Sequence, residues 1–75
     1  MSAEWIVYRV WFPVLSEEGT TREESMEVSA HPLRRQPLIK HQVWLLLSQK
    51  GYDLDPTEGG IEAIGTEIVT YEGGK

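Results

Sequence analysis

The chain of 75 residues contains no cysteine, which excludes disulfides and zinc–thiolate sites. It also lacks an apolar run of the roughly 20 residues that a membrane-spanning helix needs. The apolar stretch over residues 5–15 has Arg9 inside it and no basic segment before it, so we expect no secretory signal and a cytoplasmic location. A chain this short buries only about 60% of its unfolded surface. We therefore expect a single domain over residues 1–75 that needs a tight core or a partner for stability.

Acidic residues are missing from the middle of the chain. Residues 28–52 contain no Asp or Glu, although the whole chain has 12 of them and a net charge of −5. The same segment holds four of the seven basic residues, which are Arg34, Arg35, Lys40 and Lys50. The overall negative charge opposes bulk attraction to nucleic acid. Residues 28–52 are therefore the part of the sequence that would attract phosphate or an acidic protein surface.

The residue patterns of common catalytic and metal sites are also missing. A nucleophilic triad without cysteine would have to use His31 or His41, which lie in a connector and on a helix, and no phosphate-binding glycine loop occurs. Residues 53–58 resemble the start of a calcium loop, but Glu58 and Ile64 replace the required glycine and glutamate, so we interpret this segment as an acidic turn. We expect a protein that is not an enzyme and that binds no cofactor or metal.

Two strands are predicted in the first 30 residues. Residues 4–15 are rich in Trp, Ile, Val, Tyr and Phe, which favour strands, and Pro13 indicates an edge or a bulge. Residues 22–30 alternate between apolar and polar, and the polar residues 16–21 between the two strands predict a hairpin.

The hairpin should have two different faces. Same-facing side chains lie opposite each other in an antiparallel pair, so one face should be the core face. We expect that face to hold Tyr8, Val10, Phe12, Met26, Val28 and Ala30. The other face should be at least partly wet, and it carries Trp5, Val7, Arg9, Trp11, Glu23, Ser25 and Glu27.

A helix is predicted over residues 37–50. Pro37 suits its first position, Gly51 supplies a left-handed stop, and Pro32 keeps the preceding connector out of the helix. At about 100° per residue, the arc expected to face the core contains Ile39, Val43, Leu46 and Leu47. Leu38, Trp44 and Leu45 lie outside that arc, so the helix carries more apolar surface than one sheet covers.

Residues 61–71 have strand composition with a change of phase. Ile61 and Ala63 are odd-numbered, whereas Ile64, Thr66, Ile68 and Thr70 are even-numbered. Gly65 marks either a bulge or a break between two short strands. Residues 72–75 are predicted to be a disordered tail. The expected fold is α+β: a small antiparallel sheet in the order ββαβ or ββαββ, with a single helix packed on one face.

Two groups of residues are candidate contact sites. Trp5, Arg9 and Trp11 are either covered by another element or available to a partner. Arg34 and Arg35 precede the helix N-terminus, where the macrodipole disfavours cations. We expect either an external group, such as an acidic partner surface or a phosphate, or a neighbouring glutamate to favour them there. The full set of predicted partner-binding residues is Trp5, Arg9, Trp11, Arg34, Arg35, Lys40, His41, Trp44 and Leu45.

These features predict a non-catalytic protein-binding module, such as a small inhibitor, adaptor or accessory subunit, that acts through aromatic and basic surfaces. The partner would be another protein, with no membrane involved. One alternative is a nucleic-acid-contacting module that uses the basic connector and helix. A second alternative is a homo-oligomeric structural protein, with a homodimer formed through the helix.

Overall fold

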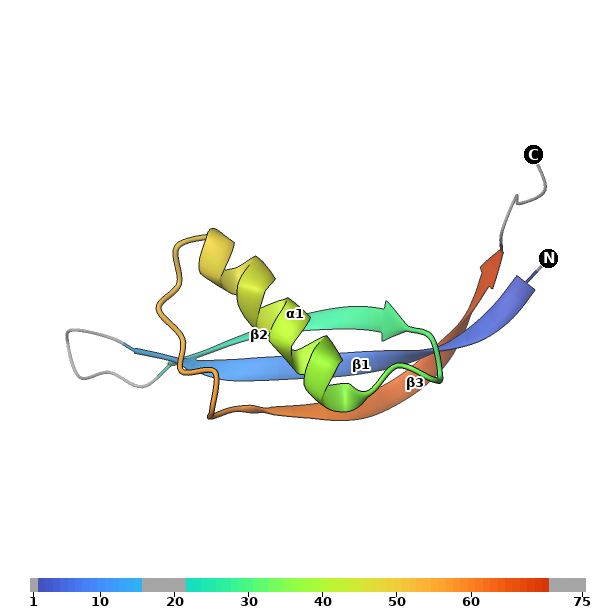
Figure 1. Cartoon of the computed structure of the whole chain (residues 1–75), viewed down its shortest axis with the longest axis horizontal. Coiled ribbons are helices and arrows are strands. Elements are labelled where there is room, and N and C mark those ends of the chain that lie inside the picture. The colour runs from blue at the N-terminus through green and yellow to red at the C-terminus, as the bar shows by residue number, and fades with distance from the viewer. Residues whose placement is uncertain (1, 16–21, 71–75) are drawn as a thin grey trace.

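The computed structural model describes residues 2–15 and 22–70, and these form one sheet and one helix. The elements are β1 (Ser2–Val14), β2 (Arg22–Ala30), α1 (Gln36–Gln49) and β3 (Gly60–Thr70). The sheet is antiparallel with the strand order β2-β1-β3, and α1 crosses one face of it diagonally (Figure 1). This confirms the predicted α+β fold in its ββαβ form. The turn expected over residues 16–21 and the tail expected over residues 72–75 lie outside the described residues.

The pairing of β1 with β2 puts the predicted apolar side chains on one face. Val10 pairs with Met26 and Tyr8 pairs with Val28, so their side chains point to the same side of the sheet. Pro13 pairs with Glu23 of β2, beyond the last pair that β1 makes with β3. The missing N–H of Pro13 therefore falls where β1 has a single partner strand, as its sequence position predicted.

The phase change in the last strand is a bulge within one continuous strand. Tyr8 of β1 pairs with Ala63 and Val7 pairs with Gly65, which leaves Ile64 as an extra residue in β3. Side chains alternate between the two faces of a strand. One extra residue therefore shifts this alternation, so that after Ile64 the even-numbered side chains and not the odd-numbered ones face the helix. The bulge therefore explains the change of phase, and β3 does not break into two strands.

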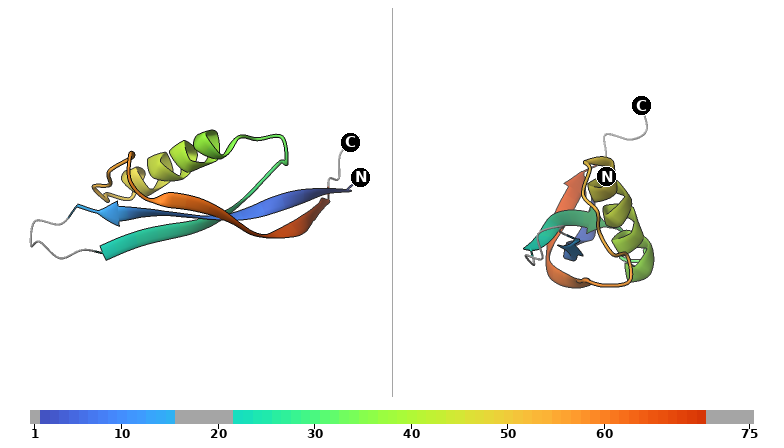
Figure 2. Two further views of the ribbon diagram at one scale, coloured as in Figure 1. Left: turned by 90° about the horizontal axis from the view of Figure 1, so that it is seen from below. Right: turned by 90° about the vertical axis from the view of Figure 1, so that its left-hand side faces the viewer.

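The helix covers only part of the sheet. At roughly 1.5 Å per helical residue α1 is about 21 Å long, whereas β1 at roughly 3.3 Å per residue is about 43 Å long. Residues 2–5 of β1 extend past the end of β2 and pair with β3 alone, which gives a two-stranded ribbon from the start of β1 and the end of β3 (Figures 1 and 2). Ile68 lies on the helix side of this ribbon, beyond the reach of the helix, and its side chain is 64% exposed.

The ends of α1 agree with the sequence signals to within one residue. The helix begins at Gln36, so Pro37 is its second residue and not its first, and Arg35 is the N-cap without a side-chain capping bond. Gly51 has a φ of +98° and its N–H donates to the Ser48 carbonyl at 3.0 Å, as expected for a glycine stop. Before the helix, a turn closes with the Arg34 N–H donating to the His31 carbonyl.

The core lies between α1 and the facing side of the sheet. Its buried members are Tyr8, Val10, Phe12, Ala30, Ile39, Val43, Leu47 and Leu54. The prediction that Leu46 belongs to the core was wrong, because its side chain is 39% exposed. The line of contact runs through Ile39, Val43 and Leu47 at four-residue spacing, which rotates Leu46 onto the flank above β2. Since β2 is the edge strand, nothing described lies beyond it to cover that flank.

Candidate contact surfaces

The structure distributes the predicted partner-binding residues over three places. Arg9 and Trp11 lie on the sheet face away from α1, and Trp5 and Arg34 line a groove between β2 and α1. Lys40, His41 and Trp44 line a smaller hollow on the other flank of α1. Arg35 is the exposed N-cap residue, and Leu45 lies on the outer surface of the helix. One continuous aromatic and basic surface therefore does not form.

On the sheet face, Arg9 is paired within the molecule. Its guanidinium lies 4.9 Å from the centre of the Trp11 ring, and its nitrogens lie 3.4 Å from a Glu23 oxygen and 4.0 Å from a Glu62 oxygen. The side chain is still 38% exposed, so each of these ion pairs contributes little to stability. Arg9 and Trp11 are half-buried, and no described element packs over them, because α1 lies on the opposite face.

The basic residues before and within α1 have a different environment. Among residues 2–15 and 22–70, the ion pairs involve Arg9 and Arg22 and include none with Arg34, Arg35, Lys40 or Lys50. Arg34 instead donates to the amide oxygen of Gln42 at 3.0 Å, and the first turn of α1 has no acidic residue. Of the two explanations for Arg34 and Arg35, internal neutralisation is therefore not found in the described part of the chain.

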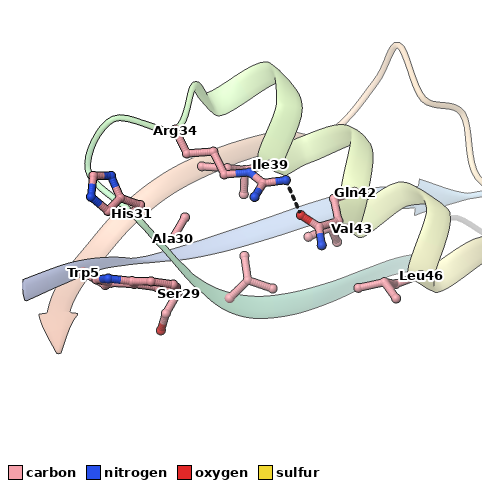
Figure 3. A pocket seen from close by; sticks show the side chains of 10 residues that line it. Trp5, Ser29, Ala30, His31, Arg34, Ile39, Gln42, Val43 and Leu46 are labelled. Atoms are coloured by element: carbon pink, nitrogen blue, oxygen red, sulfur yellow. Dashed lines mark hydrogen bonds between the residues drawn. The ribbon is translucent and has the colours of Figure 1, made fainter. Parts of the chain in front are cut away.

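The groove between β2 and α1 has a volume of about 370 Å³. Its apolar lining includes Val28 of β2 and Ile39, Val43 and Leu46 of α1, whereas Arg34 and Gln42 lie along its mouth (Figure 3). The sequence pattern did not reveal this groove. Its position depends on how far α1 stands from the edge strand, which is a property of the packed structure and not of any one segment.

The hollow on the other flank of α1 has a volume of about 260 Å³, and the rings and the cation that line it contact one another. The rings of His41 and Trp44 stack with their centres 5.8 Å apart, and the Lys40 ammonium lies 5.5 Å from the centre of the Phe12 ring. The Trp44 indole N–H donates to the carbonyl of Leu54 at 3.1 Å. These contacts tie the loop after α1 to the helix, so this flank serves the fold as well as offering a surface.

Leu54 is a core residue that sequence analysis missed. It is 4% exposed and forms an isolated bridge with Val14, although it lies between two aspartates in a loop. A single apolar residue among acidic ones was the available signal. The isolated position has no periodicity, however, and periodicity is what identifies core residues in helices and strands.

The acidic turn after α1 is organised by Asp55 and Thr57. The Thr57 hydroxyl donates to the Asp55 carboxylate at 2.6 Å and the Thr57 N–H donates to the same oxygen at 2.9 Å. The hydroxyl bond, followed by the N–H bond, lowers the pKa of Asp55 below its usual 3.8, and Lys40 adds to the effect. One oxygen of the Asp55 carboxylate is therefore engaged in a local turn. No group of three or more His, Cys, Asp or Glu side chains arranged to hold a metal occurs among the described residues.

Replacing Thr57 with valine should raise the pKa of Asp55 towards 3.8, because the substitution removes the largest cause of its lowering and keeps the N–H bond. A depressed pKa in the folded state stabilises the fold above the unfolded value and loses that effect as the pH falls through the folded value. The variant should therefore lose less stability on acidification below pH 3.8 than the parent chain. An NMR titration of the Asp55 carboxyl carbon measures the shift, with Thr57→Ser as the control that keeps the hydroxyl. An unchanged pKa in the valine variant would contradict this assignment.

Comparisons with known proteins do not assign the chain to a family. No protein-family model, curated protein or solved structure matches it at a significant level. Within the described residues, α1 does not have the length and apolarity to cross a membrane. Any functional conclusion therefore depends on the surfaces themselves.

Proposed function

We propose that this protein is a non-catalytic protein-binding module, an inhibitor, adaptor or accessory subunit that acts in the cytoplasm through aromatic and basic surfaces. The observation that supports this most is the exposure of leucines around two arginines that form no ion pair with any described residue. Leu33 is 86% exposed and Leu38 is 58% exposed, and Arg34 and Arg35 lie between them. Exposed apolar groups rimmed by charge are typical of protein contact sites, where arginine is among the most enriched residues.

The helix extends the same surface. Leu45 is 43% exposed and lies about two turns after Leu38, on the side of α1 that faces away from the sheet. The buried line of α1 is already occupied by the core, so these leucines contribute nothing to it. Covering them with a partner would remove apolar area from water, which contributes about 25 cal/mol for each Å².

Nucleic-acid binding is the first alternative, because the basic connector and helix would attract phosphate. Stacking on bases needs a free aromatic face. The Trp11 ring has the Arg9 guanidinium near it and the Trp44 ring is stacked on His41. These contacts favour a protein partner. Salt-dependent binding to labelled single- or double-stranded oligonucleotides at low ionic strength would replace the proposed function with this alternative.

Self-assembly is the second alternative. Ile64 and Ile68 are exposed on β3, whose outer edge has no partner strand among the described residues. Light scattering over a concentration series tests it. A mass that rises to that of a dimer, and that falls back in an Ile68→Lys variant, would favour assembly over binding of a different protein.

Capture experiments with surface variants test the proposed function. The tagged protein, a Leu38→Ser/Leu45→Ser double variant and an Arg35→Gln variant are incubated with extract of the source cells, and the bound proteins are quantified by mass spectrometry. We expect a specific partner whose capture falls about tenfold, or about 1.4 kcal/mol, in each variant. Leu15→Ser is the matched control, because Leu15 is 55% exposed but lies at the far end of β1. Equal capture by all four proteins would overturn the site assignment, and capture of nothing specific would overturn the proposed function.

A further inference from the structure

The groove between β2 and α1 opens onto the free edge of the sheet. Three consecutive residues of β2, Val28, Ser29 and Ala30, line it, although successive side chains of a strand point to opposite faces. A hollow at the edge of a strand can meet atoms of residues with opposite facings, and this lining therefore fits a groove along the edge of β2. In Figure 3 the side chains of Ala30 and Ser29 point to opposite sides of the strand and both border the groove.

The outer edge of β2 has no partner strand among the described residues. The sheet order is β2-β1-β3, so β2 has β1 on one side and no described strand on the other. Alternate residues of an edge strand point their N–H and C=O groups outwards, where an extended peptide can pair with them. The groove therefore combines a row of backbone hydrogen-bonding groups with an apolar hollow above it.

The hollow suits an aliphatic side chain. Ile39 and Val43 form its inner wall and are almost fully buried, whereas Leu46 forms its outer wall and is partly exposed. A strand added beside β2 would send one side chain up between β2 and α1. The next side chain would point to the opposite face of the sheet, where Trp5 borders the groove (Figure 3).

The charged residues near the groove differ in sign between β2 and the turn that follows it. Glu23, Glu24 and Glu27 follow Arg22 along β2 and make this strand acidic, whereas Arg34 lies beyond its end and has no carboxylate partner among the described residues. Arg34 donates instead to the neutral amide of Gln42. This bond uses one of the five N–H donors of the guanidinium, so an incoming carboxylate of opposite charge can bind to the other donors.

We propose that this groove binds an extended segment of a partner protein as a fourth strand on β2. An aliphatic side chain of the segment lies between β2 and α1, and a carboxylate of the segment pairs with Arg34. The inference depends on the proposed function in one respect, which is that the ligand is part of a protein. The carboxylate belongs either to an Asp or Glu side chain or to the C-terminus of the segment.

A peptide selection with matched variants tests the groove. Random eight-residue peptides with free C-termini are selected on the immobilised protein, and the enriched sequence is synthesised with a fluorescent label for anisotropy titrations. Leu46→Ser and Arg34→Gln alter the groove. Leu15→Ser and Lys50→Gln are the controls, because Leu15 and Lys50 are exposed and do not line the groove. We expect an enriched sequence with an aliphatic and an acidic position or end, and binding about tenfold weaker for each groove variant and unchanged for each control.

Modified peptides test the individual contacts. Replacing the acidic residue of the peptide with its amide, or amidating the C-terminus, should remove the difference in peptide affinity between the parent protein and Arg34→Gln. The modification that removes this difference identifies the carboxylate that pairs with Arg34. N-methylation of one set of alternate peptide amides should abolish binding, whereas methylation of the other set should leave it unchanged, because a strand pairs through one side only. Equal binding of both methylated forms would overturn strand addition.

Other outcomes separate the groove from the wider function. The absence of any enriched sequence, or enriched peptides that bind Leu46→Ser and Arg34→Gln as well as the parent protein, would overturn the groove inference. If the captured protein partner still binds both groove variants normally, the proposed function stands without the groove. If the peptides bind in the groove and no partner depends on Leu38 and Leu45, the groove inference stands and the proposed contact surface fails.

Discussion

Replacing Phe12 with alanine should move the unfolding of the protein to a much lower urea concentration. Phe12 is fully buried on the central strand, where it belongs to the same core cluster as Val10 and Val43. Truncating a buried phenylalanine costs about 3 to 5 kcal/mol. Domains typically have about 0.05 to 0.15 kcal/mol of stability for each residue, so a chain of this length has roughly 4 to 11 kcal/mol in total. The substitution removes a large share of that stability.

The measurement is urea unfolding followed by tryptophan fluorescence. Leu38→Ala is the matched control, because Leu38 is well exposed and its truncation should change the free energy of unfolding by less than about 0.5 kcal/mol. A second measurement is the NMR signal of the Lys40 side chain. It should shift in Phe12→Ala, because the contact between the Lys40 ammonium and the Phe12 ring is lost. A loss of stability in Phe12→Ala no greater than that in Leu38→Ala would contradict the position of Phe12 in the core.

The alternation of side chains was sufficient to predict the hairpin and its core face. Residues that alternate along β1 and β2 can pair in only one of two facings, and Tyr8, Val10 and Phe12 offered the more apolar one. The helix could be predicted for a similar reason, because a proline near its start and a glycine after its end bracket one apolar arc. Local chemistry decides each of these features, so sequence patterns reveal them.

The rest depends on how the elements meet. Leu46 belongs to the apolar arc of α1, yet it is exposed. The reason is that β2 below it is an edge strand, and no described strand lies beyond β2 to cover Leu46. The bulge at Ile64 was predicted only as one of two choices, because a break and a bulge change the phase in the same way. The predicted contact residues likewise divide among three surfaces, because that division depends on which flank of α1 faces β2.

The division of the surfaces also changes the meaning of the acid-free segment. Sequence position groups Arg34 with Lys40, but the structure places Arg34 at the groove and Lys40 in the hollow on the opposite flank. Lys40 is engaged with Phe12 and lowers the pKa of Asp55, whereas Arg34 has a neutral partner. The segment therefore combines a basic residue that helps to hold the fold with one that is available to an acidic ligand.

Replacing Gly59 with alanine should destabilise the protein by roughly 2 to 5 kcal/mol. Gly59 has a φ of +82°, which costs a residue with a Cβ about 1 to 2 kcal/mol. The added Cβ would also overlap the carbonyl oxygen of Trp11 and lie 3.0 Å from the Cα of Phe12, so the backbone of β1 would have to move. Overpacking of this kind typically costs a further 1 to 3 kcal/mol or so.

Gly51→Ala separates the two contributions to that cost. Gly51 also has a positive φ, at +98°, but an added Cβ would meet no atom within 4 Å. This variant should therefore lose only the backbone part, about 1 to 2 kcal/mol. Thermal and urea unfolding of both variants measure the difference, and the NMR signal of the Trp11 indole should shift in Gly59→Ala alone, because Gly59 approaches β1 at Trp11. Equal losses in the two variants would show that the close approach of Gly59 to β1 contributes nothing to stability.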